Sequence, residues 1–167
     1  MSVPAVSIVM SLYNEAPFVE EAVASILSQT FSDFELLVID DGSTDGGADV
    51  VARIADPRIR LIRQQNQGLA GALNTGIRAA RAEWIARHDA DDLSEPGRLA
   101  AQFEAVTRRP DLVLLGTNAV MMDEEGEPLT TTAHPTDDPT IRAILFDRHL
   151  GNPFIHGSMM MRRAALF

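Results

Sequence analysis

Cysteine and lysine are both absent from this sequence of 167 residues. Without cysteine, the chain can form neither a disulfide nor a thiolate metal site. Without lysine, it lacks the phosphate lysine of a P-loop, a Schiff-base nucleophile and the lysine expected in a phospho-receiver domain. The basic residues are therefore all arginines, 14 in number. Any ligand would be held by arginine, backbone N–H groups, acidic side chains or a metal.

The sequence also has little positive charge and no long apolar run. Its net charge of -10 leaves no basic stripe for a nucleic-acid backbone, so we expect no nucleic-acid partner. No apolar run approaches about 18 residues, which predicts no membrane segment in this chain. The start, Met1–Pro4, lacks the regions of a signal peptide. We therefore expect a cytoplasmic location, with membrane association of a longer protein left open.

The hydrophobic pattern predicts an α/β fold in a single domain with a sizeable core. Short β-branched runs indicate buried strands, and apolar residues at helical spacing follow each of them. The expected strands are 5–10, 34–39, 59–63 and 84–88, and the expected helices are about 17–29, around 50–54, 69–81 and 96–107. This alternation predicts an open, mainly parallel, Rossmann-like sheet with helices on both faces.

After Pro110 the pattern is less regular. We expect one strand formed by 112–115 and the following 117–122, a turn over 123–128 that closes a hairpin, and a helix that begins at 138–139. The methionine run 159–161 is most simply a buried strand.

Polar residues cluster where the predicted strands end. They are Ser11, Tyr13 and Asn14 after the first strand, Asp40 and Asp41 after the second, and Asp89, Asp91 and Asp92 after the fourth. In an open parallel sheet, ligands bind outside the carboxyl ends of the strands. The clustering therefore predicts a binding site at that edge.

The run Asp89-Ala90-Asp91-Asp92 places three carboxylates within four residues. Two such charges about 4 Å apart repel by about 4 kcal/mol at a protein surface. A hard cation such as Mg²⁺ or Mn²⁺ would relieve that repulsion. A solvated acidic turn is the alternative, but the position on the same edge as Asp40, Asp41 and Tyr13 favours a metal site.

Three other phosphate-binding classes fit poorly. A dinucleotide site needs Gly-x-Gly-x-x-Gly directly after a strand, and Gly68, Gly71 and Gly76 have a different spacing. A phospho-receiver domain needs a lysine. A magnesium-dependent phosphohydrolase needs an aspartate after its first strand, where this chain has Ser11–Asn14. A transferase in which a metal holds a nucleotide diphosphate as leaving group fits best.

Several ordered motifs support that interpretation. They are 6–15, 25–31, 35–45, 66–68, 72–76 and 89–92, followed by Pro96, Arg98–Leu99 and the stretch 152–163. In these motifs the chain resembles the N-terminal part of family 2 glycosyltransferases, which have the A-type, nucleotide-diphospho-sugar transferase fold. No single motif is specific, but their order over about the first 110 residues is.

The resemblance implies roles for residues near the nucleoside. Ser11 and Tyr13 would lie beside it, with Tyr13 stacked on the base, and Asp41, with Asp40 beside it, would accept hydrogen bonds from the pyrimidine or ribose. Simple packing is the alternative for Tyr13, and a helix-capping role is the alternative for Asp40.

The resemblance also implies a Mn²⁺ or Mg²⁺ site. Asp89 and Asp91 match the family's Asp-x-Asp signature, with Asp91 as the more direct metal ligand. Asp92 would orient a sugar hydroxyl or a metal-bound water. His156 would face the sugar-phosphate, with a structural role as the alternative.

The implied activity is metal-dependent, inverting transfer from a nucleotide-diphospho-sugar to a glycan or lipid-linked acceptor, in polysaccharide or cell-envelope glycan synthesis. UDP-sugars are favoured by family frequency alone. A non-catalytic nucleotide-sugar binding or scaffold module of the same fold is the alternative, and a homo-oligomer is left open.

The general base is the missing part of this assignment. Family members supply it from an acidic pair that follows the arginines matched by Arg162 and Arg163, and no acid follows them here. Asp137, Asp138 and Asp147 are candidates only by default. We therefore expect residues 1–167 to be one incomplete domain that contains the donor pocket, with the base and the acceptor region beyond residue 167.

Overall fold

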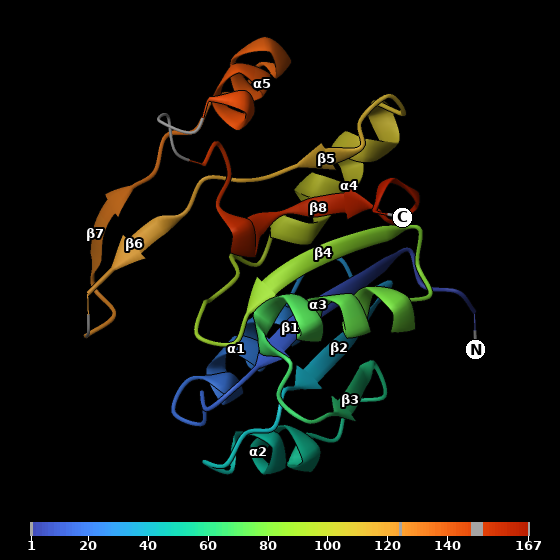
Figure 1. Ribbon diagram of the computed structural model, residues 1–167, viewed down its shortest axis with the longest axis vertical. Helices are drawn as coiled ribbons and strands as arrows, with labels where there is room; N and C mark the ends of the chain where they lie inside the picture. The colour runs from blue at the N-terminus through green and yellow to red at the C-terminus, as the bar shows by residue number, and fades with distance from the viewer. Residues whose placement is uncertain (1, 124, 148–151, 167) are drawn as a thin grey trace.

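A six-stranded sheet in the order β3-β2-β1-β4-β8-β5 organises the molecule (Figure 1). The computed structural model describes residues 2–123, 125–147 and 152–166. Strands β1 (Val6–Leu12), β2 (Phe34–Asp40), β3 (Ile59–Arg63) and β4 (Trp84–Asp89) are parallel. Strand β8 (Met160–Arg162) runs antiparallel between β4 and β5 (Leu114–Leu115). The predicted mainly parallel sheet is confirmed.

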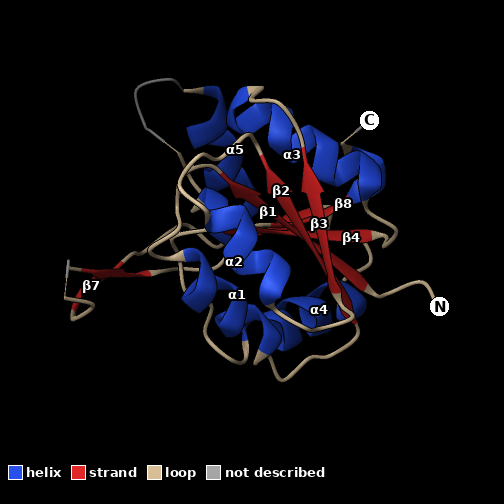
Figure 2. Cartoon of the chain, turned by 90° about the horizontal axis from the view of Figure 1, so that it is seen from below, coloured by secondary structure: helices blue, strands red, loops and turns tan. Residues whose placement is uncertain are grey.

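Helices cover both faces of this sheet, as predicted (Figure 2). Helices α1 (Val19–Leu27), α2 (Gly47–Arg53) and α4 (Arg98–Arg108) pack on one face, against one apolar cluster. Helix α3 (Gly68–Ala79) packs on the other face, against a second cluster. Strand alternation explains the division, because Ile8 and Met10 belong to the first cluster and Val9, between them, belongs to the second.

The predicted boundaries differ from the observed ones by small amounts at most elements. Helix α1, which we expected to begin at Pro17, begins at Val19. The reason is a tight turn, since the N–H groups of Phe18 and Val19 both donate to the carbonyl of Glu15. Strand β3 has the predicted bounds and is more exposed than its neighbours, as its interleaved arginines indicate.

The segment after α4 forms a hairpin and a helix that project from the sheet (Figure 1). Strands β6 (Val120–Met122) and β7 (Pro128–Thr131) pair as the predicted hairpin. Glu124, within the predicted turn, lies outside the described residues. Helix α5 (Asp138–Phe146) begins where expected, because the Asp137 side chain accepts a hydrogen bond from the Thr140 N–H at 2.9 Å. The methionine run contributes to β8, where Met160 is fully buried.

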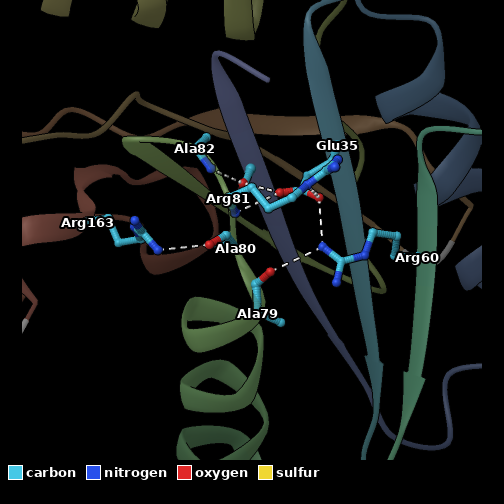
Figure 3. A network of polar contacts seen from close by, with 8 residues as sticks. Glu35, Arg60, Ala79, Ala80, Arg81, Ala82 and Arg163 are labelled. Atoms are coloured by element: carbon cyan, nitrogen blue, oxygen red, sulfur yellow. Dashed lines mark hydrogen bonds and ion pairs between the residues drawn. The ribbon is translucent and has the colours of Figure 1, made fainter. Parts of the chain in front are cut away.

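The amino-terminal edge of the sheet is held by one buried carboxylate (Figure 3). Glu35 on β2 accepts hydrogen bonds from the Ser7 hydroxyl at 2.6 Å and from the guanidinium groups of Arg60 and Arg81 at 2.9 Å each. The Arg81 backbone N–H donates to it as well. This network joins β1, β2, β3 and the segment between α3 and β4 at the edge opposite the predicted site.

Among the helices that the structure describes, none combines the length and the apolar character that crossing a bilayer requires.

Candidate functional site

A cavity of about 720 Å³ lies at the carboxyl ends of β1, β2 and β4. The first residues of α3 form one side of it, and the 3₁₀ turn η1 (His156–Ser158) contributes His156. The lining residues are Ser11, Leu12, Tyr13, Glu15, Asp41, Asn66, Gly68, Leu69, Ala72, Arg87, Asp89, Ala90, Asp91, Asp92 and His156. The cavity therefore lies at the carboxyl edge of the sheet, where the sequence predicts a binding site.

The loops that follow β1 and β2 are tied to each other. Asn14 adopts a left-handed backbone, with φ of 57°, and its side-chain oxygen accepts a hydrogen bond from the Thr44 N–H at 2.9 Å. The Asn14 N–H donates to the Ser43 hydroxyl at 3.2 Å. Tyr13, which immediately precedes it, is half exposed and borders the cavity. The ring is thus accessible to a ligand in the cavity.

The two adjacent aspartates after β2 have different environments. Asp41 is buried and lines the cavity, and its Oδ1 accepts hydrogen bonds from the Gln64 side chain at 2.7 Å and the Gln67 N–H at 2.9 Å. Asp40 is buried too, but it does not line the cavity, and its Oδ1 accepts from the Ser43 N–H at 2.9 Å. Asp40 therefore holds the turn, whereas Asp41 presents its carboxylate to the cavity.

The acidic run Asp89–Asp92 lies at the end of β4, where its carboxylates repel one another. Asp89 is half-buried and is paired with the Arg87 guanidinium, and Asp91 is exposed. Loss of hydration, and then the charge of Asp91, raise the pKa of Asp92. The same two causes raise the pKa of Glu15 across the cavity. Asp91 is thus the centre of a negative field that a cation would relieve.

A buried polar network supports the end of β4 from the face opposite Arg87. Burial, together with the charges of Arg98 and Arg87, lowers the pKa of His88 to about 3, so this histidine is neutral. Its Nδ1 lies 3.4 Å from the Ser94 hydroxyl. Arg98 donates to that hydroxyl at 2.9 Å and to the Arg87 carbonyl at 2.6 Å. The network fixes the strand end from which Asp89 and the following acids project.

The turn η1 closes the cavity from the distant end of the sequence. Gln102 on α4 donates to the Ser158 carbonyl at 2.8 Å, and the Ser158 hydroxyl donates to the Thr117 carbonyl at 3.1 Å. Burial, and then the charge of Arg87, lower the pKa of His156, which favours its neutral form. A Cβ added to Gly157 would lie within 2.8 Å of carboxylate oxygens of Asp89 and Asp92. The backbone of η1 therefore packs directly on the acids.

Seven of the eight residues predicted for the site line this one cavity. They are Ser11, Tyr13, Asp41, Asp89, Asp91, Asp92 and His156, and the eighth, Asp40, does not. The prediction missed Glu15, Asn66 and Arg87. The signal for Arg87 was available, because side chains two residues apart on a strand share a face and Arg87 precedes Asp89 by two.

The acidic residues of the cavity can hold a divalent cation only if a bound ligand supplies further coordinating atoms. Within residues 2–123, 125–147 and 152–166, no three histidine, aspartate or glutamate side chains converge closely enough to hold a metal ion by themselves. Mg²⁺ sites in enzymes that act on phosphate substrates usually use one or two carboxylates, and the substrate phosphates and waters complete the coordination. The arrangement of Asp89 and Asp91 fits that donor set.

Comparison with known proteins identifies the family. The model of glycosyl transferase family 2 matches residues 7–167. The chain belongs to this family. The putative glycosyltransferase EpsE of Bacillus subtilis (strain 168) is 36% identical over 166 residues, which are 97% of this chain and 58% of EpsE. The chain therefore spans little more than half the length of that relative.

Solved structures of glycosyltransferases share the A-type fold with this family 2 chain. The mannosyltransferase PcManGT from Pyrobaculum calidifontis, in complex with GDP-Man and Mn²⁺, has a TM-score of 0.71 and 24% identity, with 99% of this chain and 46% of that one covered. TarS 1–349 of S. aureus, in complex with UDP-GlcNAc, has a TM-score of 0.71 and 18% identity, with 96% and 46% covered. At these identities the likeness is one of fold.

Proposed function

We propose that this domain binds a nucleotide-diphospho-sugar together with a divalent cation, and that the longer protein transfers the sugar to an acceptor. The observation that carries the proposal is the composition of the cavity at the carboxyl ends of β1, β2 and β4. Five carboxylates and one arginine line it (Glu15, Asp41, Asp89, Asp91, Asp92 and Arg87). Family membership makes sugar transfer the reaction to which this chemistry belongs.

The excess of carboxylates requires a cation if the ligand is a diphosphate. An anionic ligand in an acidic cavity is repelled, and a divalent ion bound to both the protein and the phosphates converts that repulsion into attraction. We assign the direct contact to Asp91, which is exposed, and a supporting contact to Asp89, whose carboxylate is already paired with Arg87. Mn²⁺ and Mg²⁺ both suit these oxygen ligands, and the fold relative PcManGT is in complex with Mn²⁺. When bound, the ion would stabilise the diphosphate as a leaving group.

The nucleoside would lie over β1 and β2. Asp41 is fixed by its two hydrogen bonds and can accept from the base or ribose, and Tyr13 is exposed enough to stack on the base. Ser11 lines the cavity as well. We favour a UDP-sugar, although the two fold relatives bind different donors, GDP-Man in one and UDP-GlcNAc in the other.

The sugar would lie between Asp92 and His156, which both line the cavity. We propose inversion at the anomeric carbon, with a carboxylate as general base for the acceptor hydroxyl. We place that base, and the surface for a glycan or lipid-linked acceptor, beyond residue 167 of the longer protein. The cytoplasmic location and the homo-oligomer stay predictions.

Thermal unfolding with a panel of ligands tests the donor-site assignment. The protein is heated with Mn²⁺, with UDP or GDP, and with each nucleotide and Mn²⁺ together. Ligand at about 100 times its Kd adds about 2.7 kcal/mol of stability, which for a domain of this size corresponds to a rise in Tm of about 5 to 11 °C. We expect that rise only when metal and one nucleotide are both present. If Mn²⁺ with either nucleotide produces no rise, the assignment is wrong.

A second experiment separates an enzyme from a binding module. The longer protein is incubated with Mn²⁺ and the donor whose nucleotide raised the Tm, and release of the nucleoside diphosphate is followed with and without a glycan extract. An enzyme releases it faster with the acceptor. Stable donor binding with no release in either condition favours the non-catalytic alternative.

A further inference from the structure

Arg87 is a buried arginine that faces the donor cavity. It is 3% exposed, it lies on β4, and it lines the cavity together with Asp89 on the same face of the strand. Among the described residues that line the cavity, it is the only arginine. Its position therefore combines burial with access to a ligand.

The hydrogen bonds of Arg87 leave part of its guanidinium without a partner. One terminal nitrogen donates to Asp89, but Nε is buried and has no partner in the part of the chain that the structure describes. A buried donor that stays unpaired destabilises the folded protein. Since a guanidinium carries five N–H donors, the single pair with Asp89 does not account for this side chain.

Arg98, which is partly buried, shows how a purely structural arginine is paired in the same protein. Its Nε donates to Gln102, one terminal nitrogen donates to Ser94, and the other donates to the Arg87 carbonyl. It does not line the cavity. All three of its nitrogens are paired within the protein, whereas the Nε of Arg87 is not.

We propose that Arg87 binds the diphosphate of the donor. This inference rests on the proposed function, and it adds a contact that the protein makes without the metal. A guanidinium matches phosphate oxygens with two parallel N–H donors, and its attraction to an anion is strongest where water is excluded. The metal at Asp91 and the guanidinium of Arg87 would then hold the diphosphate from two sides.

The packing around Arg87 fixes its guanidinium for this contact. Asp89 pairs with one of its terminal nitrogens, and a Cβ added to Gly157 would lie 3.1 Å from that same nitrogen. The bond from Arg98 to the Arg87 carbonyl, at 2.6 Å, holds the backbone. A side chain held at this nitrogen and at its backbone loses little conformational entropy when a phosphate binds.

The test compares the affinities of UDP and uridine, each with Mn²⁺, in wild type and Arg87→Met. GDP and guanosine replace them if GDP is the nucleotide that the wild type binds. We expect Arg87→Met to weaken UDP binding by about tenfold or more and to leave uridine binding unchanged, because only UDP carries the diphosphate. A UDP affinity within about twofold of wild type overturns the inference. An equal loss for UDP and uridine also overturns it, because that pattern indicates a structural role.

Two further variants separate the loss of a phosphate contact from a general loss of stability. Arg87→Lys keeps the charge and loses the planar fork, and it carries the test if the methionine variant does not fold. We expect about threefold weaker UDP binding from it, and an unchanged affinity overturns the inference. Arg60→Met removes a partner of Glu35 at the opposite edge of the sheet, and we expect it to lower the Tm without changing UDP affinity.

The outcomes separate this inference from the proposed function. If wild type binds neither UDP nor GDP with Mn²⁺, both are wrong. If wild type binds and Arg87→Met binds equally well, only the role of Arg87 is wrong. If Arg87→Met loses affinity for UDP-GlcNAc but not for UDP, Arg87 contacts the sugar and the diphosphate contact is wrong.

Discussion

Asp91 is exposed and lines the cavity, and loss of hydration followed by the charge of Asp91 raises the pKa values of both Glu15 and Asp92. We predict that Asp91→Asn abolishes the metal-dependent rise in Tm with nucleotide and leaves the fold intact, because the residue is exposed and the ion loses its direct ligand. Circular dichroism and thermal unfolding measure both effects. Asp33→Asn, the same change at an exposed position before β2, should keep the full rise. An Asp91→Asn variant that binds as wild type does would refute the ligand role.

His88 gives the stability of the domain a dependence on pH. Its pKa falls from 6.5 to about 3 on folding, because burial, Arg98 and Arg87 disfavour the charged form. Between these values the unfolded chain binds the proton and the folded chain does not, so stability is lost as pH falls below 6.5. From pH 7 to pH 5 the loss is about 2 kcal/mol.

His88→Met removes this proton uptake and fills the site with an unbranched side chain. Urea unfolding at pH 7 and pH 5 compares the two proteins. We expect wild type to lose about 2 kcal/mol more than the variant over this interval. An equal loss in both would show that the acid sensitivity has another source.

At the scale of elements, the two ends of the sheet have separate tasks. The carboxyl end carries the cavity, and the amino end is joined by Glu35. Burial would raise the pKa of Glu35, but hydrogen bonds from Ser7, Arg81 and Arg60 outweigh it and lower the pKa. Glu35 therefore stabilises the fold as a carboxylate, and this stability is lost as pH falls below its ordinary value of 4.5.

Glu35→Gln should destabilise the domain by about 2–3 kcal/mol, because two arginines lose a charged partner. Both arginines are partly exposed, so water compensates part of the loss. Nucleotide affinity should not change, since Glu35 lies at the far edge of the sheet. Chemical denaturation and a nucleotide titration measure the two quantities. Glu83→Gln, at an exposed position near the same edge, is the control and should change stability little. If Glu35→Gln weakens nucleotide binding in the folded protein, the two ends are not independent.

The elements with strong periodicity could be predicted from the sequence. Strands such as β1 and β2 are short apolar runs closed by polar residues, and their hydrophobic period decides their type. The antiparallel position of β8 between β4 and β5 could not be predicted, because three residues carry too little local pattern and their pairing partners lie far away in the sequence.

The location of the candidate site could be predicted from strand direction, but the orientation of individual side chains could not. Parallel strands bring their carboxyl ends together, so Tyr13, Asp41 and the acids after β4 could be placed at one edge before their contacts were known. Which of Asp40 and Asp41 faces the cavity depends on where the strand ends and its turn begins, and the sequence does not specify that point. Arg87 was missed although its spacing of two residues from Asp89 on β4 places both side chains on one face of the strand.

At the scale of the whole molecule, the central claim is that metal and nucleotide bind as a pair. The described residues offer no complete metal site, and the cavity that would take the nucleotide is acidic. Each ligand therefore needs the other, and by linkage the strengthening must be equal in both directions.

Calorimetric titration in both orders measures this coupling most directly. UDP or GDP is titrated with and without Mn²⁺, and Mn²⁺ is titrated with and without the nucleotide. We predict that each strengthens the binding of the other by the same factor, about tenfold or more, which is about 1.4 kcal/mol of coupling. Nucleotide affinity that is the same with and without Mn²⁺ would contradict the account.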